Sequence, residues 1–480
     1  MASSLSSLSA ASAVGAAWRR AVTWVFGLAT LGELVLILLP SSALKAALGA
    51  VFAIGLILAV PATDRLTRIT IVPLLVAGGW LLSVSSASPV QWLEALAELG
   101  PIYAMTIAVR LVGIPIEYGD YAARLRAVLE RWGQGVRGGH YLAWSALNYV
   151  LALLALFGSL PITYNLMDHT LERGPDPIRM MARWRLINIA LLRSIALAAT
   201  WGPVSAGATL SLHIAGVAWQ AIVPIGILLS AVGMALSLLL ERSWLSAWDD
   251  LAAGLESGPA NGTGGAAIAN AARGGTPKDT AAQAASAATM LAFFALLVAI
   301  VVACQQVFGW SIFASVTLAS LVTSTVWVIR LGQARHYPRL IEAYVVRSLP
   351  QSASTFALFT ALGVFIYALE TSHAGETLAA SLSARGLLGE SEIATFALTE
   401  GLVLLLSFVG IPGLVALGVV GQPLVLTGAL EPLPLALALI IGNVMAGASS
   451  PFSVSNLLLA ALQPGTSPVV TGIRLNLVWA

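Results

Sequence analysis

Long apolar runs recur along the whole of this sequence, and they constrain its fold more than any other feature. Hydrophobic residues make up 58% of the 480 residues and charged residues only 10%, whereas a soluble domain carries about 25% charged residues. A helix that crosses a bilayer needs about 20 apolar residues. We therefore predict an all-α polytopic membrane protein with about ten to thirteen membrane segments.

The expected spans are distributed over both halves of the chain. They fall at 21–40, 46–61, 69–86, 97–116, 140–160, 219–240, 286–308, 311–329 and 352–369, with a second broken unit at 393–430 and shorter apolar arms at 186–200, 208–218, 432–447 and 457–462. Arg19 and Arg20 precede the first run, which is too long for a cleaved signal peptide. We expect a retained signal-anchor helix with a cytoplasmic N-terminus, in a multi-pass protein of the cell inner membrane.

Four prolines interrupt apolar segments in two matching pairs. Pro161 and Pro203 are 42 residues apart in the first half, and Pro412 and Pro451 are 39 apart in the second. A broken helix leaves backbone groups that lipid cannot satisfy, so such breaks persist only against protein, water or a ligand. Breaks at corresponding positions of two halves are typical of a transporter's substrate site. We expect two repeats, each with a broken helix and a re-entrant hairpin.

Charges indicate that the two repeats have inverted topology. The basic stretch just before the first broken unit, at 124–137, carries four arginines and is expected to lie on the cytoplasmic surface. The loop before the second unit, at 370–392, carries one arginine and is separated by span 352–369 from a second arginine-rich loop at 330–347. Arginine-rich short loops favour the cytoplasmic side. If both are cytoplasmic, the two broken units start from opposite faces.

Small polar residues surround the second break of each pair. We predict that they bind substrate through free N–H groups at helix amino ends, although small residues also allow tight helix packing. The predicted substrate-binding residues are Thr200, Gly202, Pro203, Ser205 and Thr209 in the first half, and Ser449, Ser450, Pro451, Ser453 and Asn456 in the second.

Unwound carbonyls and side-chain oxygens suit a coupling cation. The candidates for ion coupling are Gly158, Ser159, Gly410, Asn443, Ser455 and Glu400. Arg193 lies in an apolar arm and is a candidate partner for an anionic substrate, but it equally suits an interfacial position or an internal acid. For Glu33 and Glu98, in the N-terminal spans, we expect structural or interfacial roles.

Turn-forming residues divide the chain near its middle. Residues 241–285 are rich in glycine and alanine and are interpreted as a linker loop. We therefore expect N-terminal scaffold helices at 1–139, a first repeat core at 140–240, further scaffold at 286–351 and a second repeat core at 352–480.

Enzyme signatures are absent from the sequence. It has no phosphate-binding loop, nucleophile elbow or paired metal-binding histidines. Its basic residues are scattered, which argues against nucleic-acid binding, and its single cysteine, Cys304, excludes an internal disulfide. We predict no enzymatic activity, no cofactor and no bound metal, with Na⁺ or H⁺ as the coupling ion. A polytopic membrane enzyme or glycan polymerase, and a non-transporting membrane assembly protein, are the alternatives.

Residues 140–240 and 350–470 together resemble the ion transporter superfamily, which includes divalent-anion/sodium symporters and citrate and lactate permeases. The resemblance lies in a broken helix with a Gly/Pro tip followed by a small-polar hairpin tip in each half. Sodium/dicarboxylate members carry Ser-Asn-Thr at these tips. This chain has Ser455-Asn456-Leu457 at one tip and Gly207-Ala208-Thr209 at the other.

The resemblance implies hairpins that move together as a transport domain against a scaffold, which often forms a dimer. We therefore expect an ion-coupled secondary transporter of a small organic anion, lying in the lipid bilayer as a homodimer. Its midplane site would lie between the two hairpin tips.

Overall fold

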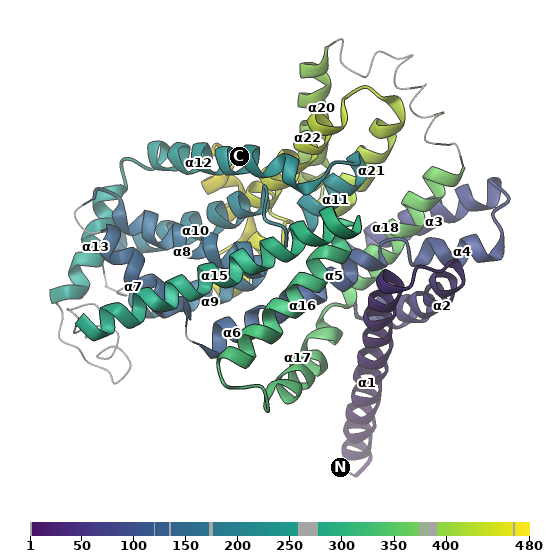
Figure 1. Ribbon diagram of the computed structural model, residues 1–480, viewed down its shortest axis with the longest axis horizontal. Helices are drawn as coiled ribbons and strands as arrows, with labels where there is room; N and C mark the ends of the chain where they lie inside the picture. Colours follow the sequence, from purple (N-terminus) through teal and green to yellow (C-terminus); the bar gives the residue numbers. More distant parts are fainter. Residues whose placement is uncertain are drawn as a thin grey trace.

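The computed structural model describes residues 1–480 apart from 1, 120, 134–135, 172–175, 258–276, 373, 375–376, 378–380, 382–390 and 464–465. Within the described part, every regular element is a helix (Figure 1). Ten stretches are long and apolar enough to cross a membrane: Gly15–Leu38, Ser42–Ala62, Thr67–Val84, Pro89–Tyr118, Gly139–Asp168, Trp219–Leu240, Ala285–Phe308, Ile312–Arg330, Ala353–Thr371 and Pro432–Leu462. The predicted class, an all-α polytopic membrane protein, is confirmed.

The N-terminal helices pack together at one side of the molecule (Figure 1). They are α1 (Ala2–Leu38), α2 (Ser42–Ala59), η1 (Val60–Ala62), α3 (Arg65–Val84), α4 (Pro89–Leu96) and α5 (Gly100–Leu111). The Phe356 ring, from a helix of the second half, stacks on Phe26 of α1 at 4.1 Å and on Phe52 of α2 at 5.0 Å between ring centroids. Outward side chains such as Trp24, 79% exposed, are apolar, as contact with lipid requires.

The next helices contain the first broken unit. They are α6 (Gly113–Tyr118), α7 (Tyr121–Gly133), α8 (Gly139–Ala155), η2 (Leu156–Gly158), α9 (Ser159–Thr170), α10 (Pro177–Ala199), α11 (Ala206–Ala215), α12 (Trp219–Leu240) and α13 (Leu245–Ser257). The basic stretch expected on the cytoplasmic surface forms α7, which packs against α8. Arg126 of α7 is buried over the Trp144 ring of α8, 5.3 Å from its centroid.

The segment interpreted as a linker loop, 241–285, is helical at both ends. α13 occupies Leu245–Ser257, and α15 begins at Pro277; residues 258–276 lie outside the described part of the chain. Helix α13 lies within the expected loop because Trp248 anchors it: this side chain is fully buried, and its indole N–H donates to the Ala182 carbonyl at 3.0 Å. The loop prediction rested on the alanine-rich composition and overlooked an amphipathic helix, which packs on α8 and α10.

The remaining helices complete the second half. They are α15 (Pro277–Phe308), α16 (Ile312–Arg330), α17 (Tyr337–Gln351), α18 (Ala353–Thr371), α20 (Glu392–Phe408), α21 (Gly413–Thr427), α22 (Pro432–Ser449), α23 (Val454–Leu462) and the π-helical turn η3 (Val470–Arg474). α8 packs on α10, α20 packs on α22, and α10 contacts α22. The short helix α11 lies against both α21 and α22 (Figure 1).

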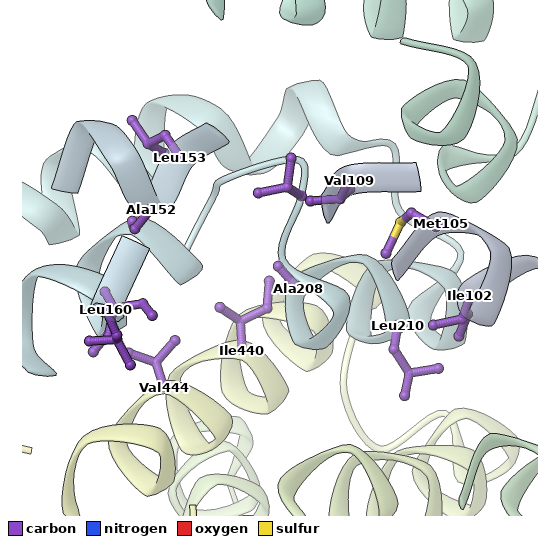
Figure 2. Close-up of a cluster of buried hydrophobic side chains, with 14 of the residues drawn as sticks. Ile102, Met105, Val109, Ala152, Leu153, Leu160, Ala208, Leu210, Ile440 and Val444 are labelled. Carbon is purple, nitrogen blue, oxygen red and sulfur yellow. The ribbon is translucent and has the colours of Figure 1, made fainter. Parts of the chain in front are cut away.

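Apolar side chains fill the space around α11. Figure 2 shows Ala208 of α11 and Ile440 of α22 pointing toward each other, within one cluster of buried hydrophobic residues. Leu210, two residues further along α11, lies on the side of Ile102 and Met105 of α5 (Figure 2). Helix α11 is therefore held between α5 and α22.

Candidate functional site

Two helices are interrupted at the predicted prolines. Pro203 lies in the segment between α10 and α11, and Pro451 lies between α22 and α23. Proline lacks an N–H group and clashes with the preceding helical turn, so a continuous helix through either position is unfavourable. Both prolines are buried. Protein therefore surrounds the backbone groups that each interruption leaves without a partner in the helix.

A serine starts each helix that resumes after an interruption. Ser205 Oγ accepts a hydrogen bond from the Ala208 N–H at 3.3 Å, and Ser453 Oγ accepts one from the Asn456 N–H at 3.3 Å. Serine is a preferred N-cap because its oxygen satisfies an unpaired N–H of the first turn. The two predicted tips therefore share the same local geometry.

The hydroxyl groups at the second interruption satisfy its backbone carbonyls. Ser450 Oγ donates to the Ser407 carbonyl at 2.7 Å, which ties this interruption to the end of α20. Ser453 and Ser455 both donate to the Gly447 carbonyl, at 2.9 and 2.6 Å. These predicted site residues thus fix the shape of the chain where α22 ends.

Asn456 keeps one buried acceptor free. Its side chain is fully buried, and Nδ2 donates to the carbonyls of Ala448 and Ser450 at 3.0 Å and to Ser453 Oγ at 3.0 Å. Its Oδ1 has no hydrogen-bond partner among the described residues. A buried amide oxygen without a donor can accept a bond from a cation or from a donor group of a ligand.

The first interruption is held by similar contacts within its own half. Thr200 Oγ1 donates to the backbone of α10 at 2.7 Å, and Thr209 Oγ1 donates to the Ser205 carbonyl at 2.9 Å. A Cβ atom at Gly202 would lie 2.6 Å from the Ala198 carbonyl oxygen, so this turn requires glycine. All of the predicted residues at this tip are buried.

Asn443 joins the first interruption to the second half. A Cβ atom at Gly207, in the first turn of α11, would lie 2.2 Å from Asn443 Nδ2. A Cβ atom at Gly413, the first residue of α21, would lie 2.6 Å from Asn443 Oδ1. Two glycines thus let the amino ends of two helices approach the same amide, whose residue remains partly accessible.

The start of α21 is a third chain interruption. Gly410 has φ of 100°, a conformation that strongly favours glycine, and the Ile411 N–H donates back to the Leu406 carbonyl at 3.0 Å. This Schellman motif ends α20. Pro412 then starts α21 as its N-cap. The N–H groups of the first turn of α21 consequently begin beside Asn443.

The corresponding break of the first half differs from the prediction in its position. The helix ends at Leu156, which has φ of 42°, and Pro161 lies in the first turn of α9. Proline is tolerated there because the first N–H groups of a helix have no intrahelical acceptor. Of the two ion-coupling candidates here, Gly158 is exposed, and Ser159 is buried and donates to the Leu156 carbonyl at 2.7 Å.

Arg193 pairs with an internal acid. Its Nη2 donates to Glu241 at 2.9 Å, its Nη1 to Ser237 at 2.7 Å and its Nε to Asn476 at 2.9 Å, and the guanidinium lies over the Trp479 ring. The sequence left three roles open for Arg193, and the structure shows the pairing with an acid. The arginine ties the C-terminal segment to α10 and α12.

Glu400, the remaining ion-coupling candidate, lies where α20 packs against Gly442 of α22. A Cβ atom at Gly442 would lie 2.9 Å from the Glu400 carbonyl oxygen. The Glu400 residue itself is half-buried. The backbone of α20 at Glu400 therefore positions the turn of α22 that carries Asn443.

The sequence placed Gly207 at the first hairpin tip without assigning it a role, and it gave no site role to Gly413 or Asn148. Gly413 follows Pro412 directly, and Asn148 interrupts an apolar run, so each had a local signal. The Asn148 amide donates to the Leu191 carbonyl at 3.0 Å, and its Oδ1 is buried without a partner in the described part of the chain.

Open space lies elsewhere on the molecule. A surface hollow of about 700 Å³ on α3 is lined by Arg65, Arg68, Ile69, Val72 and Pro73, and a smaller one lies between α15 and α16. Neither includes a residue of the interruptions. Within the described ranges, no group of three or more His, Cys, Asp or Glu side chains could hold a metal ion.

Comparison of the chain with protein-family models and with characterised proteins finds no match.

Proposed function

We propose that the protein is an ion-coupled secondary active transporter, which moves a small organic anion across the inner membrane with Na⁺ or H⁺ as the coupling ion. The observation that carries this proposal is the position of Asn443 between the amino ends of α11 and α21. Helix amino ends present unpaired N–H groups and a positive dipole end. An anion near Asn443 would face two of them.

The order of the elements supports a repeat in the two halves of the chain. In each half, an interrupted pair (α8–α9, α20–α21) is followed by a long helix and a short serine-capped helix (α10–α11, α22–α23). The equivalent long helices α10 and α22 contact each other. Repeats of this kind place a substrate between the broken helices at the membrane midplane.

The roles of the residues follow from their donors and acceptors. A substrate carboxylate would accept hydrogen bonds from the first-turn N–H groups beside Gly207 and Gly413 and from Asn443 Nδ2. Asn456 Oδ1, together with carbonyls at the second interruption, would take the cation. Because Asn456 and the predicted residues of the first tip are buried, the ligands would reach them when the core helices move as a body against the scaffold.

Uptake into proteoliposomes tests this proposal directly. We expect accumulation of at least one of succinate, citrate and lactate when a Na⁺ or a pH gradient is imposed, each gradient being applied separately. No uptake of any of the three under either gradient would count against an ion-coupled organic-anion transporter. Facilitated exchange without a gradient requirement would contradict the ion coupling alone.

Two glycine substitutions test whether Asn443 belongs to the binding site. Gly207→Ala pushes a methyl group into the space of the Asn443 amide, so we expect much slower uptake at normal membrane abundance. Gly401→Ala, in α20, is the matched control because no atom lies within 4 Å of its Cβ position. Equal uptake in both variants would remove Asn443 from the site.

The second tip has its own test. Ser453→Ala and Asn456→Ala should depress uptake, whereas Ser315→Ala removes a buried hydroxyl that donates only within α16, at 2.9 Å to the Ser311 carbonyl, and should not. If all three variants transport alike, the small residues serve packing, as the alternative interpretation holds.

A further inference from the structure

A buried carboxyl group lies outside the broken helices. Glu33 of α1 is fully buried, and neither of its carboxylate oxygens has a hydrogen-bond partner among the residues that the structure describes. An ionised carboxylate in such a place is very unfavourable unless it is paired and hydrogen-bonded. The sequence alone favoured a structural role, but burial without a partner offers no bond through which Glu33 would stabilise the fold.

The protein makes room for this carboxyl group at the start of α5. A Cβ atom at Gly100 would lie 2.0 Å from Glu33 Oε1, and the Phe52 ring lines the same space. The amino end of α5 gives the group little compensation. The Gly100 N–H already donates to the Ala97 carbonyl at 3.0 Å, and the next residue, Pro101, has no N–H.

Two charged, partly exposed side chains lie near Glu33. Lys45 of α2 forms an ion pair of 2.7 Å with Glu98, in the turn between α4 and α5, and their side chains are 30% and 18% exposed. They are the charged groups close enough to act electrostatically on Glu33. The other helix packed on α1 is α17, and it places the apolar Leu349 near Gly27.

Glu33 is enclosed, whereas the neighbouring ion pair of Lys45 and Glu98 is partly exposed. Glu98 is therefore a candidate proton donor and acceptor for Glu33. We propose that Glu33 is a proton-binding site that exchanges protons with one aqueous side through Glu98. A proton from water adds to Glu98. When side-chain movement brings the two carboxyl groups into hydrogen-bond contact, the Glu98 O–H bond breaks as an O–H bond forms at Glu33. The resting form of Glu33 is the neutral acid. This site is separate from the anion site at Asn443 and does not depend on it.

Carbodiimide labelling tests the resting form, because dicyclohexylcarbodiimide reacts with protonated carboxyl groups in apolar surroundings. On the full-length protein in liposomes, tandem mass spectrometry should find the adduct on Glu33 at neutral pH. The adduct should decline as the pH rises. The exposed Glu431 at the start of α22 is the control and should remain unlabelled. A Glu33 that stays unlabelled at every pH, or labelling suppressed by Na⁺ at constant pH, would overturn the proposal.

Charge variants test the neighbours. Lys45→Gln removes the cation that favours an ionised Glu33, so labelling should persist to higher pH. Glu98→Gln leaves Lys45 without its partner and should shift the decline to lower pH and slow proton exchange. Shifts in the same direction, or no shift in either variant, would contradict the proposed arrangement. Glu33→Gln, which keeps the side-chain shape, should fold normally and show no adduct at this position.

Discussion

The crossing of α20 and α22 allows a substitution whose cost can be worked out from the structure. A Cβ atom at Gly442 would lie 2.9 Å from the Glu400 carbonyl oxygen and 3.1 Å from Val403 Cβ. The oxygen belongs to a helix backbone and cannot rotate away as a flexible side chain would. Gly442→Ala must therefore separate the two helices or distort one of them.

The same helix provides the matched control. Gly447 of α22 has no atom within 4 Å of its Cβ position. Replacing a helical glycine by alanine stabilises by about 0.5–1 kcal/mol, and this term is common to both variants. The difference between them is then the overpacking cost alone, about 1–3 kcal/mol.

The free energy of unfolding, measured by titration with denaturing detergent, checks this difference. We expect Gly442→Ala to be less stable than the wild type and Gly447→Ala to be as stable or more stable. Equal stability of the two variants would show that α20 and α22 do not touch at Gly442. It would also contradict the position of Asn443, the next residue of α22.

Three further substitutions test other parts of the fold. Arg193→Gln leaves Glu241 buried with fewer partners and should lower the free energy of unfolding by about 3 kcal/mol; an unchanged value would contradict the ion pair. Trp248→Ala should cost about 3–5 kcal/mol and open α13, which contains three leucines, to thermolysin; protection equal to wild type would show that α13 is not docked. Asp64→Ala, at the α3 N-cap, should cost about 1 kcal/mol. Although burial acts to raise the pKa of Asp64, hydrogen bonds from Thr67 hold it below its ordinary value. The cap contribution is therefore complete at neutral pH and is lost as the pH falls through the lowered pKa, so the variant and wild type should converge in acid.

The membrane class and the interruptions could be predicted because both are local. Apolar length decides whether a helix can span, and Pro203 and Pro451 break helices through their own chemistry. The break before Pro161 was placed too late because proline tolerates the first turn of a helix, and the sequence did not show where α8 would end.

Contacts between distant segments could not be predicted in the same way. Arg193 pairs with Glu241, which the sequence assigned to a linker, and with Asn476, which follows the second interruption. Likewise, nothing in the order of residues indicates that Gly207 and Gly413 meet at Asn443. Such pairings depend on how the helices pack and not on any local pattern.

The most direct test of the anion site is the accessibility of Asn443 in the working protein. Cys304 is the only cysteine of the chain, so Cys304→Ala provides a background in which Asn443→Cys is the single thiol. We predict that a membrane-permeant maleimide labels this thiol in liposomes and that a transported anion, supplied with its coupling ion, slows the labelling. Glu431→Cys should label at the same rate with and without the anion. Labelling of Asn443→Cys at a rate that no anion changes, in a protein that still transports, would contradict a site at the amino ends of α11 and α21.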